Sequence, residues 1–349
     1  MRIGLQLGYG RDFRKDAAHV AELEKAGLDL VSVAEAYSFD AVSQLGYLAA
    51  RTERLELTSG IMQLYSRTPT LTAMTAAGLD YVSKGRFTLG LGASGPQVVE
   101  GFHGLRYDAP LGRTRETIEI CRQVWRRERV SYSGRHYQVP LPAEAGTGLG
   151  KPLKLINHPV RERIPVSVAA IGPKNVALVA EVAEGWEPIF FHPEKAHEVW
   201  GESLAAGRAK RSPELGELDI SVGIHVAFTE NEVELETFLD EVRPQLALYI
   251  GGMGARGKNF YHDLACRYGY EDAARSIQDA YLAGRKKEAA AAVPDDLVRA
   301  ISLIGPSAFI EERLAALRAA GVTAIKAHLL SPEHAAQIAA VERLTELAA

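Results

Sequence analysis

The chain has 349 residues, of which 47% are apolar and 24% charged, the balance of a folded protein that can bury a large core. The formal charge of −4 shows no domain-wide basic excess, which argues against nucleic acid or a membrane surface as the partner. The two cysteines, Cys121 and Cys266, have no Cys-x-x-Cys spacing, which argues against a disulfide framework or a thiolate zinc site.

The first residues, MRIGLQLGYG, contain no apolar stretch followed by a cleavage site, and no apolar run approaches about 18 residues. We therefore expect a cytoplasmic protein without a membrane span.

Strand-like and helix-like segments alternate along the chain. Four strands are predicted in the first half, at 2–7, 28–34, 55–64 and 86–92. The helices expected after them are 13–26, 39–51, 69–83 and 111–127. After an irregular stretch the strands resume at 165–170, 187–191, 220–228 and 322–329. The helices of this half are expected at 173–184, 193–209, 306–320 and 332–347, with more helix between 230 and 303.

Eight β-then-α units predict an α/β fold, a TIM (β/α)8 barrel. The strands are continuous apolar runs, as expected for a parallel sheet covered by helices. The main alternative is a doubly wound open sheet. The segment after the first strand, Gly8-Tyr9-Gly10-Arg11-Asp12, lacks the third glycine of a dinucleotide-binding loop, which favours the barrel.

Two segments interrupt the alternation. Residues 128–162 contain SYSGRHYQVP, which predicts a small hairpin turning at Ser133-Gly134, and residues 230–300 are mainly helical. We interpret both as insertions in a single barrel domain that spans residues 1–349.

Function in such a barrel collects at the carboxyl-terminal ends of the strands. In AAIGPKNVALVAEVAEGW, residues 169–186, a strand turns through Gly172 into a helix that begins with Pro173 and Lys174. Free amide groups and the helix dipole make such a turn suitable for a phosphate, although it could also be an ordinary βα turn. LGLGASGPQV, residues 89–98, is a second glycine-rich strand exit, either a ligand contact or a flexible loop.

Few side chains offer chemistry by themselves. Glu35, at the end of the second strand, is either an acid facing a site or half of a structural ion pair. His103 is a candidate acid or base, or a packing residue. His192 and His197 have no obvious third partner, so we expect no metal site, and no Gly-x-Ser-x-Gly elbow indicates a serine hydrolase.

The third predicted strand contains a lone glycine, Gly60, which marks a bulge, a tight bend or a close approach to the backbone. The segments SVAEAYSFDA, TSGIMQLYSRTPTLTAMTAAGLD, SKGRFTLGLGASGPQVVEGFHG and AAIGPKNVALVAEVAEGW together resemble the bacterial luciferase-like family. They are most similar to its branch of oxidoreductases that use the deazaflavin coenzyme F420. The resemblance covers most of residues 1–330 and is weakest in the two insertions.

The resemblance implies a bacterial luciferase-like TIM barrel with the deazaflavin at its carboxyl-terminal face. It also implies a bulge in the third strand with a cis peptide bond that involves no proline, at Gly60-Ile61 beside Ser59; an ordinary β-bulge is the alternative. Glu35 matches an acidic position near the deazaflavin. Further cofactor contacts carry over from the two glycine-rich strand exits: Gly92, Ser94, Gly95, Gly172, Pro173 and Lys174.

Two positions depart from the alcohol and sugar-phosphate dehydrogenases of the family. Ala36 stands where they have a histidine, and Pro96 where they have a glutamate. Besides Glu35, the remaining candidates for proton transfer are Tyr37, Glu100 and His103.

Three functions stay open from the sequence. The first is hydride transfer between F420 and an organic small molecule. The second is an FMN-dependent monooxygenase on the same barrel, and the third is a non-catalytic cofactor-binding or partner protein. The resemblance also implies a homodimer formed through the early helices.

Overall fold

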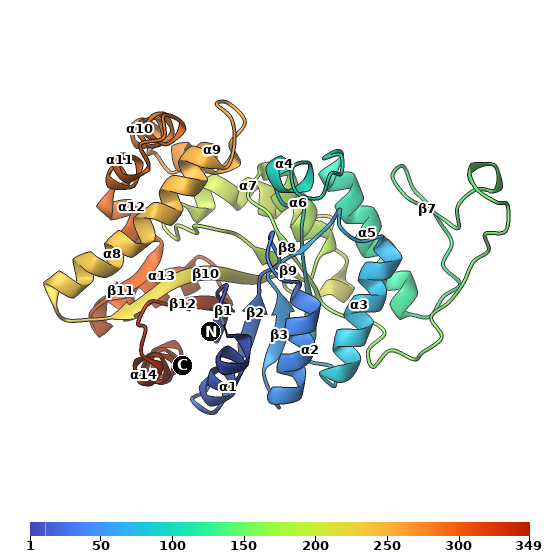
Figure 1. Ribbon diagram of the computed structural model, residues 1–349, viewed down its shortest axis with the longest axis horizontal. Helices are drawn as coiled ribbons and strands as arrows, with labels where there is room; N and C mark the ends of the chain where they lie inside the picture. Colours follow the sequence, from blue (N-terminus) through green and yellow to red (C-terminus); the bar gives the residue numbers. More distant parts are fainter. Residues whose placement is uncertain (11) are drawn as a thin grey trace.

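The computed structural model describes residues 1–10 and 12–349. Arg11, part of the segment compared with a dinucleotide-binding loop, lies outside the described residues. Among them, eight parallel strands close into a barrel, which confirms the predicted fold (Figure 1). The barrel strands are β1 (Arg2–Leu7), β2 (Leu30–Val33), β3 (Glu56–Ser59), β5 (Phe87–Gly92), β8 (Val166–Ala169), β9 (Gly185–Glu187), β10 (Asp219–Phe228) and β12 (Ala324–Leu329).

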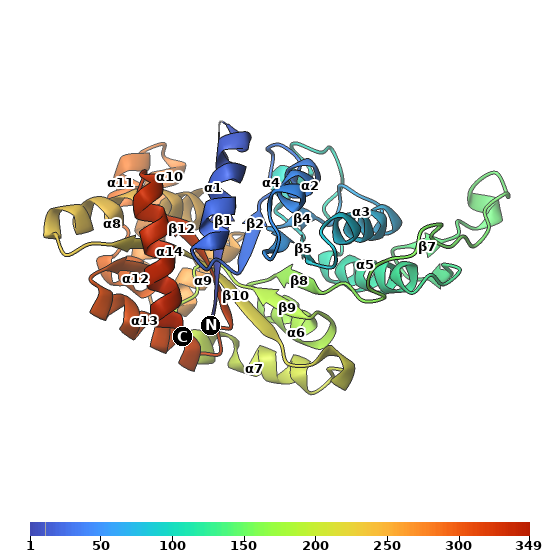
Figure 2. The ribbon, with the colours of Figure 1, turned by 90° about the horizontal axis from the view of Figure 1, so that it is seen from below.

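Pairing runs in chain order from β1 to β9, and β10 closes the circle by pairing with both β9 and β12. β12 returns to β1, with Ile325 opposite Ile3. The two ends of the chain meet beside this closure, where the amino terminus of Met1 donates a hydrogen bond of 3.1 Å to the carbonyl of Ala348 (Figure 2).

Helices cover the outside of the barrel and bury apolar faces against it (Figure 1). They are α1 (Phe13–Lys25), α2 (Ala41–Arg51), α3 (Pro69–Val82), α5 (Pro110–Trp125), α6 (Pro173–Val182), α7 (Ala196–Arg208), α13 (Ser307–Ala319) and α14 (His334–Ala348). The side chains of Asp12, Asp40 and Thr68 accept hydrogen bonds from first-turn amides, which fixes where α1, α2 and α3 begin. In the part of the chain that the structure describes, no helix is long and apolar enough to cross a membrane.

The structure corrects several predicted elements. The third strand stops at Ser59 and resumes as β4 (Met62–Gln63), which pairs with β5. The strand predicted at 187–191 lies earlier, at β9. A strand missed by the sequence, β11 (Ser302–Gly305), pairs with the carboxyl-terminal half of β10, and a short helix α4 (Pro96–Val99) follows β5.

The segment 128–162 contains the expected hairpin, β6 (Tyr132–Ser133) with β7 (Gln138–Val139), and extends away from the barrel (Figures 1 and 2). Its turn lies at residues 134–137 rather than at Ser133-Gly134, because the amide of Gly134 already bonds to the carbonyl of Tyr137.

The segment 230–300 is helical, as expected. Its elements are α8 (Glu232–Ala247), a π-helical turn η3 (Leu248–Gly252), α9 (Phe260–Arg267), α10 (Glu271–Leu282), α11 (Lys286–Ala291) and α12 (Asp295–Ala300).

Candidate active site at the carboxyl-terminal end of the barrel

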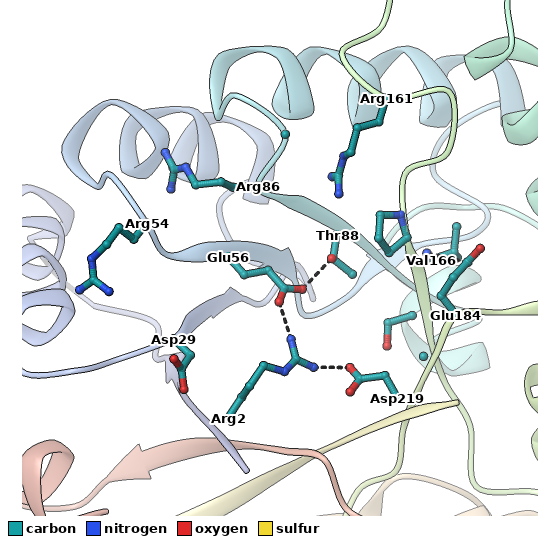
Figure 3. A pocket seen from close by; sticks show the side chains of 14 residues that line it. Arg2, Asp29, Arg54, Glu56, Arg86, Thr88, Arg161, Val166, Glu184 and Asp219 are labelled. Atoms are coloured by element: carbon teal, nitrogen blue, oxygen red, sulfur yellow. Dashed lines mark hydrogen bonds and ion pairs between the residues drawn. The ribbon is translucent and has the colours of Figure 1, made fainter. Parts of the chain in front are cut away.

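Two cavities of similar size lie at opposite ends of the barrel. The cavity at the amino-terminal end has a volume of about 440 Å³, and Figure 3 shows its charged lining. There Arg2 bridges Glu56 at 2.5 Å and Asp219 at 2.6 Å. Arg86 donates to the carbonyl oxygens of Ala49, Thr52, Leu55 and Ser83. These cations already have protein partners, so we interpret this end as a network that stabilises the barrel.

The second cavity, of about 450 Å³, opens at the carboxyl-terminal end between β1, β10 and β12 and the helices α1 and α14. Gln6 lines it, and the Gln6 carboxamide oxygen lies 3.3 Å from the position of a Cβ built on Gly60. The cavity therefore adjoins the break in the third strand.

The break contains a cis peptide bond between Gly60 and Ile61, as the resemblance implied. The amide of Gly60 still pairs with the carbonyl of Val33 at 2.7 Å, and β4 then continues beside Leu91 and Gly92. A Cβ on Gly60 would lie 2.2 Å from Oγ of Ser32, so a side chain here would require the Ser32 hydroxyl to move.

Glycines on the neighbouring strand β5 leave room for the residues on either side of the break. A Cβ on Gly90 would lie 1.7 Å from the carbonyl oxygen of Ser59, and one on Gly92 would lie 1.8 Å from Cδ1 of Ile61. The Ser59 hydroxyl both donates to the carbonyl of Gly90 and accepts from its amide, each at 2.9 Å. Ser59 thus ties β3 to β5 beneath the bulge, and its hydroxyl is occupied by these two bonds.

The turn after β8 has the form of an anion site. Gly172 precedes α6, Pro173 occupies its first turn, and no side chain of the described residues caps the helix. A Cβ on Gly172 would meet no atom within 4 Å in residues 1–10 and 12–349, so the space beside this glycine is open to an approaching group. Lys174 is exposed next to it, and Oδ1 of Asn175 has no hydrogen-bond partner among the described residues. Pro173 has no N–H, and the amide of Asn175 donates to the carbonyl of Gly172 at 3.0 Å. The amides of Gly172 and Lys174 are therefore the ones that an anionic group could approach.

Residues 1–324 match the sequence profile of the family described as luciferase-like monooxygenase. The chain belongs to this family. It is 43% identical, over 98% of its length and 99% of the relative's, to a protein of Mycobacterium tuberculosis named "Putative coenzyme F420-dependent oxidoreductase Rv3520c".

Two archaeal enzymes are more distant. The 5,10-methylenetetrahydromethanopterin reductase of Archaeoglobus fulgidus is 28% identical over 94% of this chain and 93% of the relative. In the structure of the coenzyme F420-dependent tetrahydromethanopterin reductase of Methanopyrus kandleri, the same fold recurs with a TM-score of 0.80 at 21% identity. That match covers 98% of this chain and 96% of the other.

Within this luciferase-like barrel, Glu35 forms an ion pair. Its two carboxylate oxygens accept hydrogen bonds from the guanidinium of Arg67 at 2.5 and 2.7 Å, and one of them also accepts from the amide of Ala41. The hydrogen bond to Glu35 raises the pKa of Arg67. Of the two readings that the sequence left open for Glu35, the structure contains the ion pair.

The other predicted acid–base candidates lie at the outer rim. Tyr37 is exposed, with its ring 6.3 Å from that of Phe102. Glu100 is also exposed and accepts a hydrogen bond from the amide of Tyr107 at 3.2 Å. His103 is half-buried against Phe102, and within residues 1–10 and 12–349 its Nε2 has no partner.

The loop after β5 offers a ligand backbone groups rather than functional side chains. Ser94 has a left-handed conformation with φ of 58°, which is uncommon outside glycine and asparagine, and Gly95 precedes α4. Ser94 is exposed at this turn. Gly92 therefore lies beside Ile61 of the bulge, whereas Ser94 and Gly95 lie in the loop between β5 and α4.

Sequence reasoning missed two histidines of the inner cavity. His225 on β10 and His328 on β12 line it, and their rings stack with centroids 5.0 Å apart. A signal was present: Lys326 and His328 alternate in an otherwise apolar strand, so both point to one face, and Lys326 pairs with Glu187 at 2.7 Å. Among the described residues, no group of three or more potential ligands is placed to hold a metal ion.

Proposed function

We propose that this protein is an oxidoreductase that transfers hydride between coenzyme F420 and a small organic molecule. The observation that supports it most strongly is the 43% identity, across nearly the whole of both chains, to the relative named for F420-dependent oxidation and reduction. The archaeal reductase that matches over 94% of this chain belongs to the same reaction class by name.

The residues at the carboxyl-terminal end fit this cofactor. The break at Gly60-Ile61 has small neighbours, and Ile61 itself is only half-buried, so one side of the bulge can support a planar ring. The open turn at Gly172, with Pro173 and Lys174, suits the anionic group of the cofactor's side chain. When bound, the deazaflavin supplies the hydride-transferring carbon, and the protein supplies position and shielding.

The chain's own residues would orient the reactants and exclude water. The Glu35–Arg67 ion pair and its bond to the amide of Ala41 fix the loop between β2 and α2 above the strand ends. Phe190, Tyr249 and Tyr261 pack edge to face with centroids 4.7 to 6.4 Å apart, which places an apolar wall from the 230–300 segment beside the exit of β9. We propose Tyr37, Glu100 and His103 as rim groups available for proton transfer.

The decisive experiment is a parallel titration of the purified protein with F420 and with FMN, followed by the absorbance and fluorescence of each cofactor. We expect saturable binding of F420 and much weaker binding of FMN. Lys174→Glu should weaken F420 binding at least tenfold, because it places a negative charge at the anion turn. Lys210→Glu, an equally exposed change beyond the end of α7, is the matched control. Tight FMN binding without F420 binding would favour the monooxygenase, and binding of neither would favour the non-catalytic alternative.

We also propose that the protein forms a homodimer through α3. Four large apolar side chains of this helix are exposed, at positions 71, 74, 81 and 82, and they follow the spacing of one helical stripe that also contains Gly78. Static light scattering should give twice the chain mass, and Met74→Glu should give a monomer. A monomeric wild-type protein at micromolar concentration would contradict this.

A further inference from the structure

Two stacked imidazoles lie at the inner end of the carboxyl-terminal cavity. His225 and His328 are opposite one another in the register of β10 and β12, and their rings are 5.0 Å apart at an angle of 23°. Both line the cavity that also contains Gln6, whose carboxamide lies against Gly60. The pair therefore faces the same space as the bulge that we propose supports the cofactor.

Neither imidazole forms a hydrogen bond within the part of the chain that the structure describes. Of the hydrogen bonds formed between described residues, none involves a ring nitrogen of His225 or His328. Both residues are partly buried and line the cavity, so their ring nitrogens can bind water or a ligand there.

Charge in this region is balanced without the histidines. Lys326 lies two residues before His328 on β12, and its ammonium pairs with Glu187 at 2.7 Å, both side chains being almost inaccessible to solvent. Asp16, His19 and His334 line the outer part of the cavity, where His19 and His334 stack on each other. Burial lowers the pKa of His225 to about 3, helped by His328, and lowers the pKa of His328 to about 4, helped by Lys326. Both rings are therefore neutral near pH 7.

We propose that His225 and His328 bind the uncharged oxygen function, a carbonyl or a hydroxyl group, of the small-molecule substrate. A neutral imidazole offers one N–H donor and one acceptor nitrogen, which together can satisfy either group. A buried pair without net charge gives an anionic group no counterion, so it selects against carboxylates and phosphates. The inference rests on the proposed function for its link to hydride transfer, whereas the binding itself can be tested without the cofactor.

The test uses protein labelled with 15N-histidine and four probes that share one ring: cyclohexanone, cyclohexanol, cyclohexanecarboxylate and cyclohexyl phosphate. We expect the ketone and the alcohol to shift the ring-nitrogen resonances of His225 and His328 at millimolar concentration, and the two anions to leave them unchanged. His225→Phe and His328→Phe assign the resonances and should each weaken probe binding at least fivefold. His197→Phe, an exposed histidine on α7, is the matched control.

A second variant distinguishes a loss of binding from misfolding. His225→Gln keeps a donor and an acceptor and should retain part of the binding that His225→Phe loses. Stronger shifts with the anionic probes, or no response of either imidazole to the neutral ones, would overturn the inference. Titration of the same samples with F420 separates the two proposals: probe binding without F420 binding refutes only the proposed function, and F420 binding without probe binding refutes only this inference.

Discussion

The side chain of Ile61 fills the space beside Gly92, where a Cβ would lie 1.8 Å from Cδ1 of Ile61. The two residues belong to different strands, and the contact couples the bulge of the third strand to the exit of the next. Ile61 therefore takes this position because residue 92 has no side chain. We propose that Ile61 supports the cofactor ring.

Gly92→Ala should displace Cδ1 of Ile61, the far end of a half-buried side chain. We expect the free energy of unfolding to fall by about 0.5–1.5 kcal/mol, the cost of forcing a side chain off its preferred rotamer. Urea unfolding measures this, and F420 affinity should fall together with stability. Gly46→Ala on α2 is the matched control, because a Cβ there meets no atom of the described residues within 4 Å and alanine favours a helix. Unchanged stability and F420 affinity in Gly92→Ala would show that Ile61 moves aside freely.

The sequence was sufficient to predict the bulge only in part. A lone glycine in an apolar strand indicated a backbone irregularity at Gly60, and the resemblance specified the cis bond. The sequence does not show why positions 90 and 92 are glycines, because the contacts of Gly90 with Ser59 and of Gly92 with Ile61 run between strands. Contacts of this kind depend on the register of β3 against β5, which periodicity does not give.

The barrel itself was predictable, since eight apolar runs followed by helices define it locally. β11 was not, because its four residues lie between helices and pair only with the long strand β10. His225 and His328 were missed for a similar reason: each is a single histidine in an apolar strand, and only the pairing of β10 with β12 brings them together.

The ion pair of Glu35 and Arg67 gives a second prediction. Their side chains are 10% and 15% exposed, so each charge has little contact with water and is compensated by the other. Glu35→Gln should destabilise the protein by about 3 kcal/mol, the lower end of the range for breaking a buried pair. The double variant Glu35→Gln/Arg67→Met should be more stable than the sum of the single changes implies, with a coupling energy above about 1 kcal/mol. Additive effects would show that the two charges contribute to stability independently of each other.

A third prediction concerns the turn at Gly172. A Cβ there meets no atom of the described chain within 4 Å. Gly172→Ala should therefore fold normally and lose less than about 1 kcal/mol of stability, the difference between the two residues before a helix. The added methyl group would nevertheless occupy the proposed anion seat, so the dissociation constant of F420 should rise at least tenfold. Equal F420 affinity in the two proteins would place the anionic group elsewhere.

The neutral histidines predict a pH dependence of stability. The pKa values of His225 and His328 are lowered from 6.5 to about 3 and about 4, so the unfolded chain binds protons that the folded protein does not between roughly pH 4 and 6.5. Stability is therefore complete above pH 6.5 and decreases as the pH falls, by about 2 kcal/mol per histidine between pH 7 and pH 5. Urea unfolding at both values measures the loss. His225→Phe and His328→Phe should each remove their share, whereas His197→Phe should not.

The last prediction concerns the barrel interior, where Lys326 and Glu187 pair at 2.7 Å with side chains 5% and 12% exposed. Lys326→Met leaves the Glu187 carboxylate without its partner, and we expect a loss of about 3–5 kcal/mol in the free energy of unfolding at pH 7. Lys326→Met/Glu187→Leu removes both charges and should recover most of that loss, because the penalty comes from the unpaired charge rather than from the missing attraction. The His328 resonance provides an independent readout, since loss of the neighbouring ammonium should raise the pKa of that imidazole. If Lys326→Met costs less than about 1 kcal/mol and leaves the pKa of His328 unchanged, the pair is solvated and does not influence the charge of that imidazole.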